Sequence, residues 1–366
     1  MAGLRVAVVA PSLHILGGQA VQADRLVRSW HNDPEVRLWL VPVNPEPPRP
    51  FRSAVNIKYV RTLVTQLSYW PLLVRELRRA DVVHVFSASY ASFLLAPLPA
   101  VIVARLLGKP VIMNYRSGEA PDHLRRSFIA RATLRAVDSN AVPSRFLQEV
   151  FARFDIQAEV IPNIVDTERF AFHRRDALRP RLLSTRNFES LYNVSCTLRA
   201  FAIVQRHHPD ASLTLVGAGS QDRALRSLTA ELGLRNVVFA GPVAPSEIWR
   251  HYADADIYVQ TPDIDNMPSS VLEAYASGCA VVSTMAGGVP AILTDGVHGL
   301  LAPCNDYKAV ARQVLQLLDD AALAARLTDA ARAGCGAYQW SAVRAQWLAL
   351  YRNLARPSAV PAPRPA

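Results

Sequence analysis

Short apolar runs alternate with amphipathic stretches along almost the whole chain. The first run, LRVAVVAPS at residues 4–12, is followed by a Gly-Gly turn and by a stretch with apolar residues at helical spacing. Strands that alternate with helices predict a parallel sheet that is covered by helices on both faces. Further runs of strand length lie at residues 36–43, 81–89, 109–117, 139–144 and 158–166.

A second series with the same alternation begins near residue 180. The chain has 366 residues, which is too long for one ordinary core and suits two domains. We therefore predict an α/β fold of two doubly wound, Rossmann-like domains, with ligands in a cleft at the carboxyl ends of the strands. The apolar runs of this second series lie at residues 180–186, 211–219, 236–243, 256–262 and 280–288.

The predicted boundary between the domains lies in IPNIVDTERF, where Pro162 interrupts regular structure. We assign residues 1–163 to an N-terminal domain and residues 164–339 to a C-terminal domain. Residues 340–355 are expected to form a terminal helix that packs back on the N-terminal domain. Residues 356–366 are rich in Pro and Ala, which predicts a disordered tail.

Positive charge is concentrated in the first half of the chain. The net charge is +10, and residues 1–165 carry 20 Lys/Arg against 12 Asp/Glu, whereas the remainder carries 20 against 18. This excess predicts attraction to an anionic membrane surface or to an anionic, lipid-linked substrate. A solvated, arginine-rich surface is the alternative. Zinc-ligand spacing and RNA-binding signatures are absent from the sequence, so we expect no nucleic-acid partner.

The cysteines and the longest uncharged segment bear on the compartment. No two of the four cysteines have CxxC spacing, which predicts a reduced compartment and no structural metal. Residues 85–104 carry no charge over about a membrane's width, but Pro97 and Pro99 would break a spanning helix. We predict a strand end, a turn and a helix there, and a cytoplasmic protein, with peripheral association at the cytoplasmic membrane face as an option.

Two glycine pairs follow predicted strands. Gly217 and Gly219 precede a helix, where backbone N–H groups can face a phosphate. The sixth position from Gly217 is Asp222, where a dinucleotide site requires Gly or Ala, so a nicotinamide or flavin enzyme is disfavoured. Gly17 and Gly18 would let the first strand–helix loop pass close to a ligand. Simple tight turns are the alternative at both places.

Asp254 and Asp256 have the spacing that holds a divalent metal in some sugar-nucleotide enzymes. They lie on the approach to the apolar run at residues 256–262, where turn and capping roles are expected. We therefore assign no metal, and no cofactor.

The stretch DNMPSSVLE sets two carboxylates apart, Asp265 in a loop and Glu273 one turn into the next helix. That helix is predicted to start near Pro268, and its free N–H groups are a seat for a diphosphate. A glycosidase needs two carboxyls about 5 to 9.5 Å apart that flank one bond. Gripping the two ends of a long ligand is a better use, with Asp265 on sugar hydroxyls and Glu273 on a ribose. The alternative is a capping Asp and an exposed helix Glu.

This stretch resembles part of the C-terminal domain of the family 4 retaining glycosyltransferases of GT-B fold. The resemblance continues through LEAYASGCAVVSTMAGGVPAILTDGVHGLLAP. That family typically shows Glu, seven residues and Glu, then a Gly-Gly-x-Pro. The opening Gly-Gly, DVVHVFSAS, VPSRFL, IPNIVDTERF, HPDASLTLVGAGS and the closing Trp-containing helix fall in the expected order. The resemblance implies a metal-independent, retaining hexosyltransferase (EC 2.4 class) that moves a hexose-type sugar from a UDP- or GDP-sugar to an acceptor hydroxyl.

The resemblance also implies residue roles. Asp265, Glu273 and Arg186 would carry catalysis. Donor binding would fall to Gly217, Gly219, Asn266, Met267, Pro268, Ser269 and Ser270, and the acceptor or cleft side to Gly17, Gly18, His84, Arg116 and Glu119. His84 has a core role on a buried strand as its alternative.

Four positions depart from the family pattern. Asp265 stands where the family usually has Glu. Tyr192 and Asn193 stand where a Lys-Gly is usual, which removes one charge-assisted contact to the diphosphate. Arg116 stands where a His is common, and an arginine can bind phosphate or an anionic acceptor.

The expected partners are a nucleotide-sugar donor and a glycan or lipid-linked acceptor, with closure of the two domains excluding water. Two alternatives remain on the same scaffold. One is another enzyme, such as an NDP-sugar epimerase or a sugar-phosphate phosphorylase. The other is a non-catalytic nucleotide-sugar-binding protein.

Overall fold

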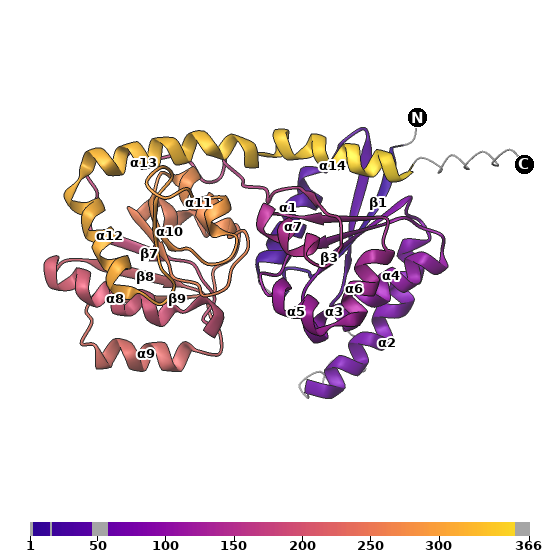
Figure 1. The fold of residues 1–366 in the computed structure, drawn as a ribbon, viewed down its shortest axis with the longest axis horizontal. Coiled ribbons are helices and arrows are strands. Elements are labelled where there is room, and N and C mark those ends of the chain that lie inside the picture. The colour runs from indigo at the N-terminus through magenta and orange to yellow at the C-terminus, as the bar shows by residue number, and fades with distance from the viewer. Residues whose placement is uncertain (1–2, 15–16, 46–57, 356–366) are drawn as a thin grey trace, which may run out of the picture.

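The computed structural model describes residues 3–14, 17–45 and 58–355 and contains two α/β domains that lie side by side (Figure 1). The first domain has one sheet of parallel strands in the order β2-β1-β3-β4-β5-β6. Its strands are β1 (Leu4–Ala10), β2 (Val36–Pro42), β3 (Val82–Ser87), β4 (Val111–Tyr115), β5 (Ser139–Val142) and β6 (Glu159–Val160). Its helices are α1 (Gly18–Ser29), α2 (Lys58–Leu77), α3 (Tyr90–Leu95), α4 (Pro97–Leu106), α5 (Ala120–Arg126), α6 (Phe128–Ala136) and α7 (Arg145–Ala152).

The second domain has a parallel sheet in the order β12-β11-β10-β7-β8-β9. Its strands are β7 (Arg181–Ser184), β8 (Ser212–Val216), β9 (Val237–Gly241), β10 (Ile257–Gln260), β11 (Ala280–Thr284) and β12 (Leu300–Ala302). Its helices are α8 (Val194–His207), α9 (Asp222–Glu231), α10 (Trp249–Asp254), α11 (Ser269–Ser277), α12 (Tyr307–Asp319) and α13 (Ala321–Gly334), and α14 (Trp340–Ala355) follows. Short 3-10 turns lie at Ser190–Tyr192, Val289–Ala291 and Cys335–Tyr338.

The central strands explain why the alternating pattern folds this way. Every residue of β3, β4 and β11 is buried, because helices cover both faces of each parallel sheet. The predicted fold class, two doubly wound domains of GT-B type, is confirmed. β12 was not predicted, since it has only three residues and too short an apolar run to be separated from the neighbouring loop.

The uncharged segment at residues 85–104 forms the end of β3, then α3, then α4, as predicted. Pro97 and Pro99 lie in the first turn of α4, where a missing backbone N–H costs no helical hydrogen bond. Among the described residues, no helix combines the length and the hydropathy that crossing a bilayer requires.

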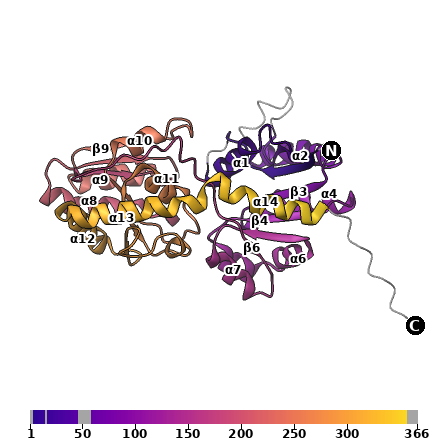
Figure 2. The same cartoon turned by 90° about the horizontal axis from the view of Figure 1, so that it is seen from above.

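The last helix crosses back to the first domain. α13 and α14 follow one another along one side of both domains, and α14 lies across the first domain (Figures 1 and 2). Trp347 and Tyr351 are buried in a core cluster with residues of β1 and α1, such as Val8 and Leu26. The predicted tail, residues 356–366, lies outside the described residues.

Candidate functional site

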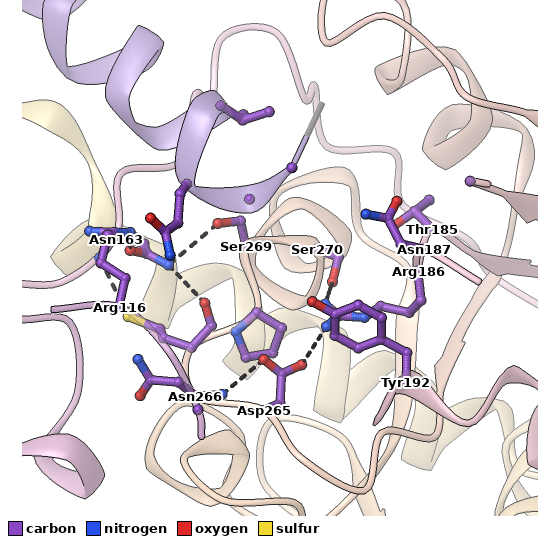
Figure 3. Close-up of a pocket in the computed structure, with 18 of the residues that line it drawn as sticks. Arg116, Asn163, Thr185, Arg186, Asn187, Tyr192, Asp265, Asn266, Ser269 and Ser270 are labelled. Carbon is purple, nitrogen blue, oxygen red and sulfur yellow. Dashed lines mark hydrogen bonds and ion pairs between the residues drawn. The ribbon is translucent and has the colours of Figure 1, made fainter. Parts of the chain in front are cut away.

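A pocket of about 360 Å³ lies between the two domains. It is lined by the loops that follow β4, β7, β8 and β10, by the start of α1 and by the start of α11 (Figure 3). In the second sheet β7 lies between β10 and β8, so the strand order reverses between β7 and β10. Ligands of open α/β sheets bind in the crevice that such a reversal creates.

Most of the predicted site residues line this one pocket. From the first domain it collects Gly17, Gly18, Arg116 and Glu119, and from the second Arg186, Gly217, Asp265, Asn266, Met267, Pro268, Ser269, Ser270 and Glu273.

His84 does not line the pocket, and its prediction as a cleft residue is wrong. Its side chain is fully buried, and its Nε2 lies 3.0 Å from Nδ2 of Asn114 while its Nδ1 lies 2.9 Å from the Tyr351 hydroxyl. Burial, helped by the charge of Arg116, lowers the pKa of His84 to about 3. His84 is therefore a neutral core residue that orients Asn114.

Gly219 is also absent from the lining, so the pocket does not bring it together with the other predicted donor residues. A Cβ there would lie 2.5 Å from the carbonyl oxygen of Phe188, which shows that the loop packs on the loop after β7. Gly217 does line the pocket. Its φ is +147°, and a Cβ would lie 2.6 Å from the carbonyl oxygen of Arg186, so only glycine lets the two loops approach this closely.

Asp265 and Arg186 form a buried ion pair at the centre of the second domain's side of the pocket. Oδ2 of Asp265 lies 2.8 Å from Nη2 of Arg186, with side-chain exposures of 12% and 10%. Nη1 of Arg186 donates to Oγ of Ser270 at 3.3 Å, and Oδ1 of Asp265 accepts from the Asn266 amide at 2.8 Å (Figure 3). Burial raises the pKa of the Asp265 carboxyl, and the Arg186 charge opposes that shift.

Arg186 keeps one unused donor. Its Nε is buried without a hydrogen-bond partner among the described residues, although an unmade hydrogen bond at a buried polar group is costly. The Tyr192 ring covers the guanidinium, with 4.0 Å between the Arg186 carbon Cζ and the ring centroid. A ligand oxygen in the pocket would satisfy this donor.

Asn193 takes the place of the glycine in the Lys-Gly pair that is usual in the family. Its φ is +44°, and its side chain accepts a hydrogen bond from the Cys196 amide as the N-cap of α8. Asparagine tolerates the left-handed conformation better than other residues with a Cβ. The chain thus keeps the backbone shape that a glycine would give, but the loop supplies Tyr192 instead of a second cation.

α11 opens toward the pocket. It starts at Ser269 after Pro268, with no side-chain cap, so the amides of its first turn are available to an anion. The loop before it is held by close backbone packing. A Cβ on Gly287 or Gly288 would lie 2.1 Å from the carbonyl oxygen of Asp265 or Asn266, respectively.

Glu273 is buried, with 7% of its surface exposed, so it is not the exposed helix Glu of the alternative interpretation. Its Oε1 lies 2.5 Å from Nη2 of Arg25, and its Oε2 accepts from the Tyr252 hydroxyl at 3.0 Å. Arg25 belongs to α1, so this ion pair joins the two domains. Gln22 supports it one turn earlier, donating to the carbonyl oxygen of Ile164 and to Oγ of Ser269, both at 2.9 Å.

Arg25, Gln22 and Tyr252 were not predicted. Gln22 and Arg25 share a face of α1, because residues three apart are neighbours on a helix. That spacing, directly after the Gly-Gly turn, was the available signal for the two α1 residues.

Asp256 has a structural role. It is fully buried and pairs with Arg175 at 3.1 Å and with Arg179 at 2.8 Å. No cluster of three His, Cys, Asp or Glu side chains within the described residues is arranged to hold a metal.

The reversal of strand order, the paired carboxylates and the open helix start define a two-domain α/β protein with a polar pocket between its domains. Two family models match almost end to end: "Glycosyltransferase Family 4" over residues 16–169 and "Glycosyl transferases group 1" over residues 165–334. The chain belongs to the family 4 glycosyltransferases of GT-B fold.

Curated relatives and solved structures agree with this assignment. The chain is 29% identical over 244 residues to the GDP-mannose-dependent alpha-(1-6)-phosphatidylinositol monomannoside mannosyltransferase of Mycolicibacterium smegmatis, covering 60% of this chain and 62% of that protein. It is 26% identical over 310 residues to the sulfoquinovosyl transferase SQD2 of Arabidopsis thaliana, covering 78% of this chain and 59% of that protein. The matches thus span about three fifths of these relatives' own length.

The structure of Anabaena Alr3699/HepE in complex with UDP-glucose superposes with a TM-score of 0.75. It shares 17% identity and covers 96% of this chain and 99% of that chain. A likeness at this level of identity concerns the fold.

Proposed function

We propose that the protein transfers a hexose-type sugar from a UDP- or GDP-sugar to an acceptor hydroxyl, with retention of configuration and without a metal. The observation that carries the proposal is the buried Arg186–Asp265 pair beside the uncapped start of α11. The pair and the helix lie where the strand order of the second sheet reverses, which is the expected place for a nucleotide.

The donor would lie along the second domain. Its diphosphate would accept hydrogen bonds from the first amides of α11 and from the free Nε of Arg186. Charge-assisted donors preorganised in a buried site stabilise the charge that develops on a leaving diphosphate. Asp265 would accept from sugar hydroxyls, and Glu273 from the ribose hydroxyls.

The acceptor would approach from the first domain, past Gly17, Gly18 and Glu119, which line that side of the pocket. In retaining enzymes of this family, the leaving diphosphate is thought to assist removal of the acceptor proton. Such assistance suits this pocket, because His84, the histidine predicted for the cleft, is buried and neutral.

The names of the relatives support an activated-sugar donor. One is described as GDP-mannose-dependent and one structural neighbour was solved with UDP-glucose. The first relative is named as acting on a phosphatidylinositol mannoside, which supports a glycan or lipid-linked acceptor for this chain.

NMR of the sugar anomeric protons tests the proposal and its two rivals. The full chain would be incubated with UDP- and GDP-hexoses, with and without a panel of glycan and glycolipid acceptors. Transfer predicts a new anomeric signal of unchanged configuration only when acceptor is present. Isomerised donor without acceptor would identify an epimerase, and donor binding without turnover would identify a binding protein.

We also propose that the first domain contacts an anionic membrane at the cytoplasmic face. Residues 58–136 carry twelve Lys/Arg against four Asp/Glu. The same region exposes large apolar side chains on neighbouring helices. They are Leu63, Leu67 and Trp70 on α2, Leu94 and Leu95 on α3, and Ile102 and Leu106 on α4, each at least 40% exposed.

These seven residues form what we call the apolar helical face. α2 is tied to the end of α3 by a hydrogen bond from Gln66 to the carbonyl oxygen of Leu95. Exposed apolar side chains beside a basic surface are typical of proteins that bind anionic lipid interfaces.

Vesicle sedimentation tests this contact. Wild type should bind vesicles with 30 mol% phosphatidylglycerol, a composition chosen at roughly the charge of an anionic leaflet, and release at high salt. Leu63→Glu/Leu67→Glu should reduce bound protein at least about fivefold. Val297→Glu, a change at an exposed apolar residue of the second domain, should not. Equal binding by the three proteins would exclude this face.

A further inference from the structure

Three arginines line the pocket, and one of them has no carboxylate partner. Arg25 pairs with Glu273 and Arg186 pairs with Asp265, at 2.5 and 2.8 Å. Elsewhere the buried Arg175 pairs with Asp256. Arg116 is half-buried and forms no ion pair with any carboxylate among the described residues, although withdrawing a charge from water without compensation is unfavourable.

Neutral groups hold Arg116 in place. Its Nη1 donates to Oδ1 of Asn114 at 3.3 Å, its Nη2 donates to Oδ1 of Asn163, and its guanidinium lies over the Phe86 ring. The two amides are themselves fixed, because Asn114 donates to His84 and Asn163 donates to the carbonyl oxygen of Met267 at 2.7 Å. These amide oxygens orient the guanidinium but leave its charge unneutralised.

The arrangement is unfavourable in the empty pocket. Burial lowers the pKa of Arg116 to about 9, which expresses the cost of keeping its charge away from water. An anion that entered the pocket would remove that cost.

We propose that Arg116 binds an oxyanion carried by a substrate, a carboxylate, sulfonate or phosphate that is separate from the donor diphosphate. Arg116 follows β4 in the first domain, whereas Arg186 and the start of α11 belong to the second. Figure 3 shows Arg116 and Arg186 on opposite sides of Asp265 and Asn266. The planar guanidinium is suited to two parallel hydrogen bonds with such a group.

The oxyanion has two possible carriers, the transferred sugar and the acceptor. Naming them in this way rests on the proposed function, since it takes the pocket as the site of sugar transfer. The chemistry that Arg116 recognises is the same in both cases.

Sulfate is the first probe, measured by thermal unfolding of the full chain. Millimolar sulfate should raise the Tm of wild type, compared with chloride at equal ionic strength, by about 2 °C or more. Arg116→Gln should respond less than wild type, because only the anion seat at the start of α11 remains, and it should unfold at a higher temperature than wild type without sulfate, because the unpaired charge is gone. Arg125→Gln, the same change at an exposed arginine of α5, should respond as wild type does.

The carrier is identified by calorimetry with a matched pair of donors, UDP-glucuronate and UDP-glucose. A preference of about tenfold for the glucuronate that disappears in Arg116→Gln would place the oxyanion on the transferred sugar. Equal affinity for both, with inorganic phosphate still binding to UDP-saturated wild type but not to the variant, would place it on the acceptor.

The proposal is overturned if Arg116→Gln and wild type respond equally to sulfate. This failure is distinct from a failure of the proposed function. UDP should bind Arg116→Gln within about twofold of wild type, because its seat lies in the other domain. Loss of all nucleotide binding in wild type would instead reject the transferase and leave the sulfate result standing.

Discussion

The two sides of the pocket differ in whether their charged side chains have a counter-charge. On the second domain's side, the carboxylates Asp265 and Glu273 each lie within 2.8 Å of an arginine, and Tyr252 and Ser270 complete the network. On the first domain's side, Arg116 is held by two amides and has no counter-charge among the described residues.

The difference indicates a division of labour. A buried pair whose partners are already in place is a preorganised seat, which binds its ligand with little rearrangement. A half-buried cation without a counter-charge gains further stabilisation when an anion binds. We therefore expect the second domain to bind the donor nucleotide in a preformed site. In the first domain, the charge of Arg116 would be neutralised by an anionic group of the substrate.

Removal of the Asp265 carboxylate should cause the largest loss of stability. Asp265→Ala leaves Arg186 buried without its carboxylate, and we expect the free energy of unfolding to fall by about 4 kcal/mol. Asp222→Ala removes the partner of Arg226 in an exposed pair, with side-chain exposures of 54% and 40%, and should cost about 0.5 kcal/mol. Urea unfolding of both variants measures the contrast, and similar losses would show that the Arg186–Asp265 pair is not special.

Gly287 tests the backbone that carries Asp265. Gly287→Ala places a Cβ against the carbonyl oxygen of Asp265, well inside van der Waals contact, at a φ of +51°. We expect a loss of about 3 kcal/mol in unfolding free energy, from steric overlap added to left-handed strain.

Gly296 provides the matched control for that variant. Its φ is +68°, but no atom lies within 4 Å of an added Cβ. Gly296→Ala should therefore show the strain alone, about 1 kcal/mol. Equal losses in the two variants would mean that the contact with Asp265 contributes nothing.

Tyr252→Phe should destabilise the protein less than Asp265→Ala or Gly287→Ala does. It removes the hydroxyl that donates to Glu273 at 3.0 Å and lies 2.8 Å from Oγ1 of Thr185. Since the Arg25 pair with Glu273 remains, we expect a loss of about 1 to 2 kcal/mol in stability, with nucleotide affinity reduced a few-fold in calorimetry. An unchanged affinity would separate Tyr252 from the nucleotide seat.

The sequence was informative where local pattern determines structure. Alternating apolar runs predicted both sheets, and the Asp265–Glu273 spacing predicted two carboxylates that line one pocket. It was wrong for His84, because burial beneath the pocket depends on segments distant in the chain. Gly219 lies outside the pocket lining for a similar reason, because its loop packs on the loop after β7.

The same limit explains what was missed. Arg25 meets Glu273 across a separation of 248 residues, and no local pattern encodes that contact. The missing partner of Arg116 is likewise a property of the assembled pocket, since the sequence shows only an arginine where a histidine is common.

Calorimetric titration of UDP and GDP into wild type and Glu273→Gln tests the central claim, that the second domain's paired carboxylates hold the donor nucleotide. Glu231→Ala, at an exposed position in α9, is the control. We predict micromolar binding of one nucleotide to wild type and control, weakened at least about tenfold in Glu273→Gln. Equal affinity in all three proteins, or no binding of either nucleotide to wild type, would contradict it.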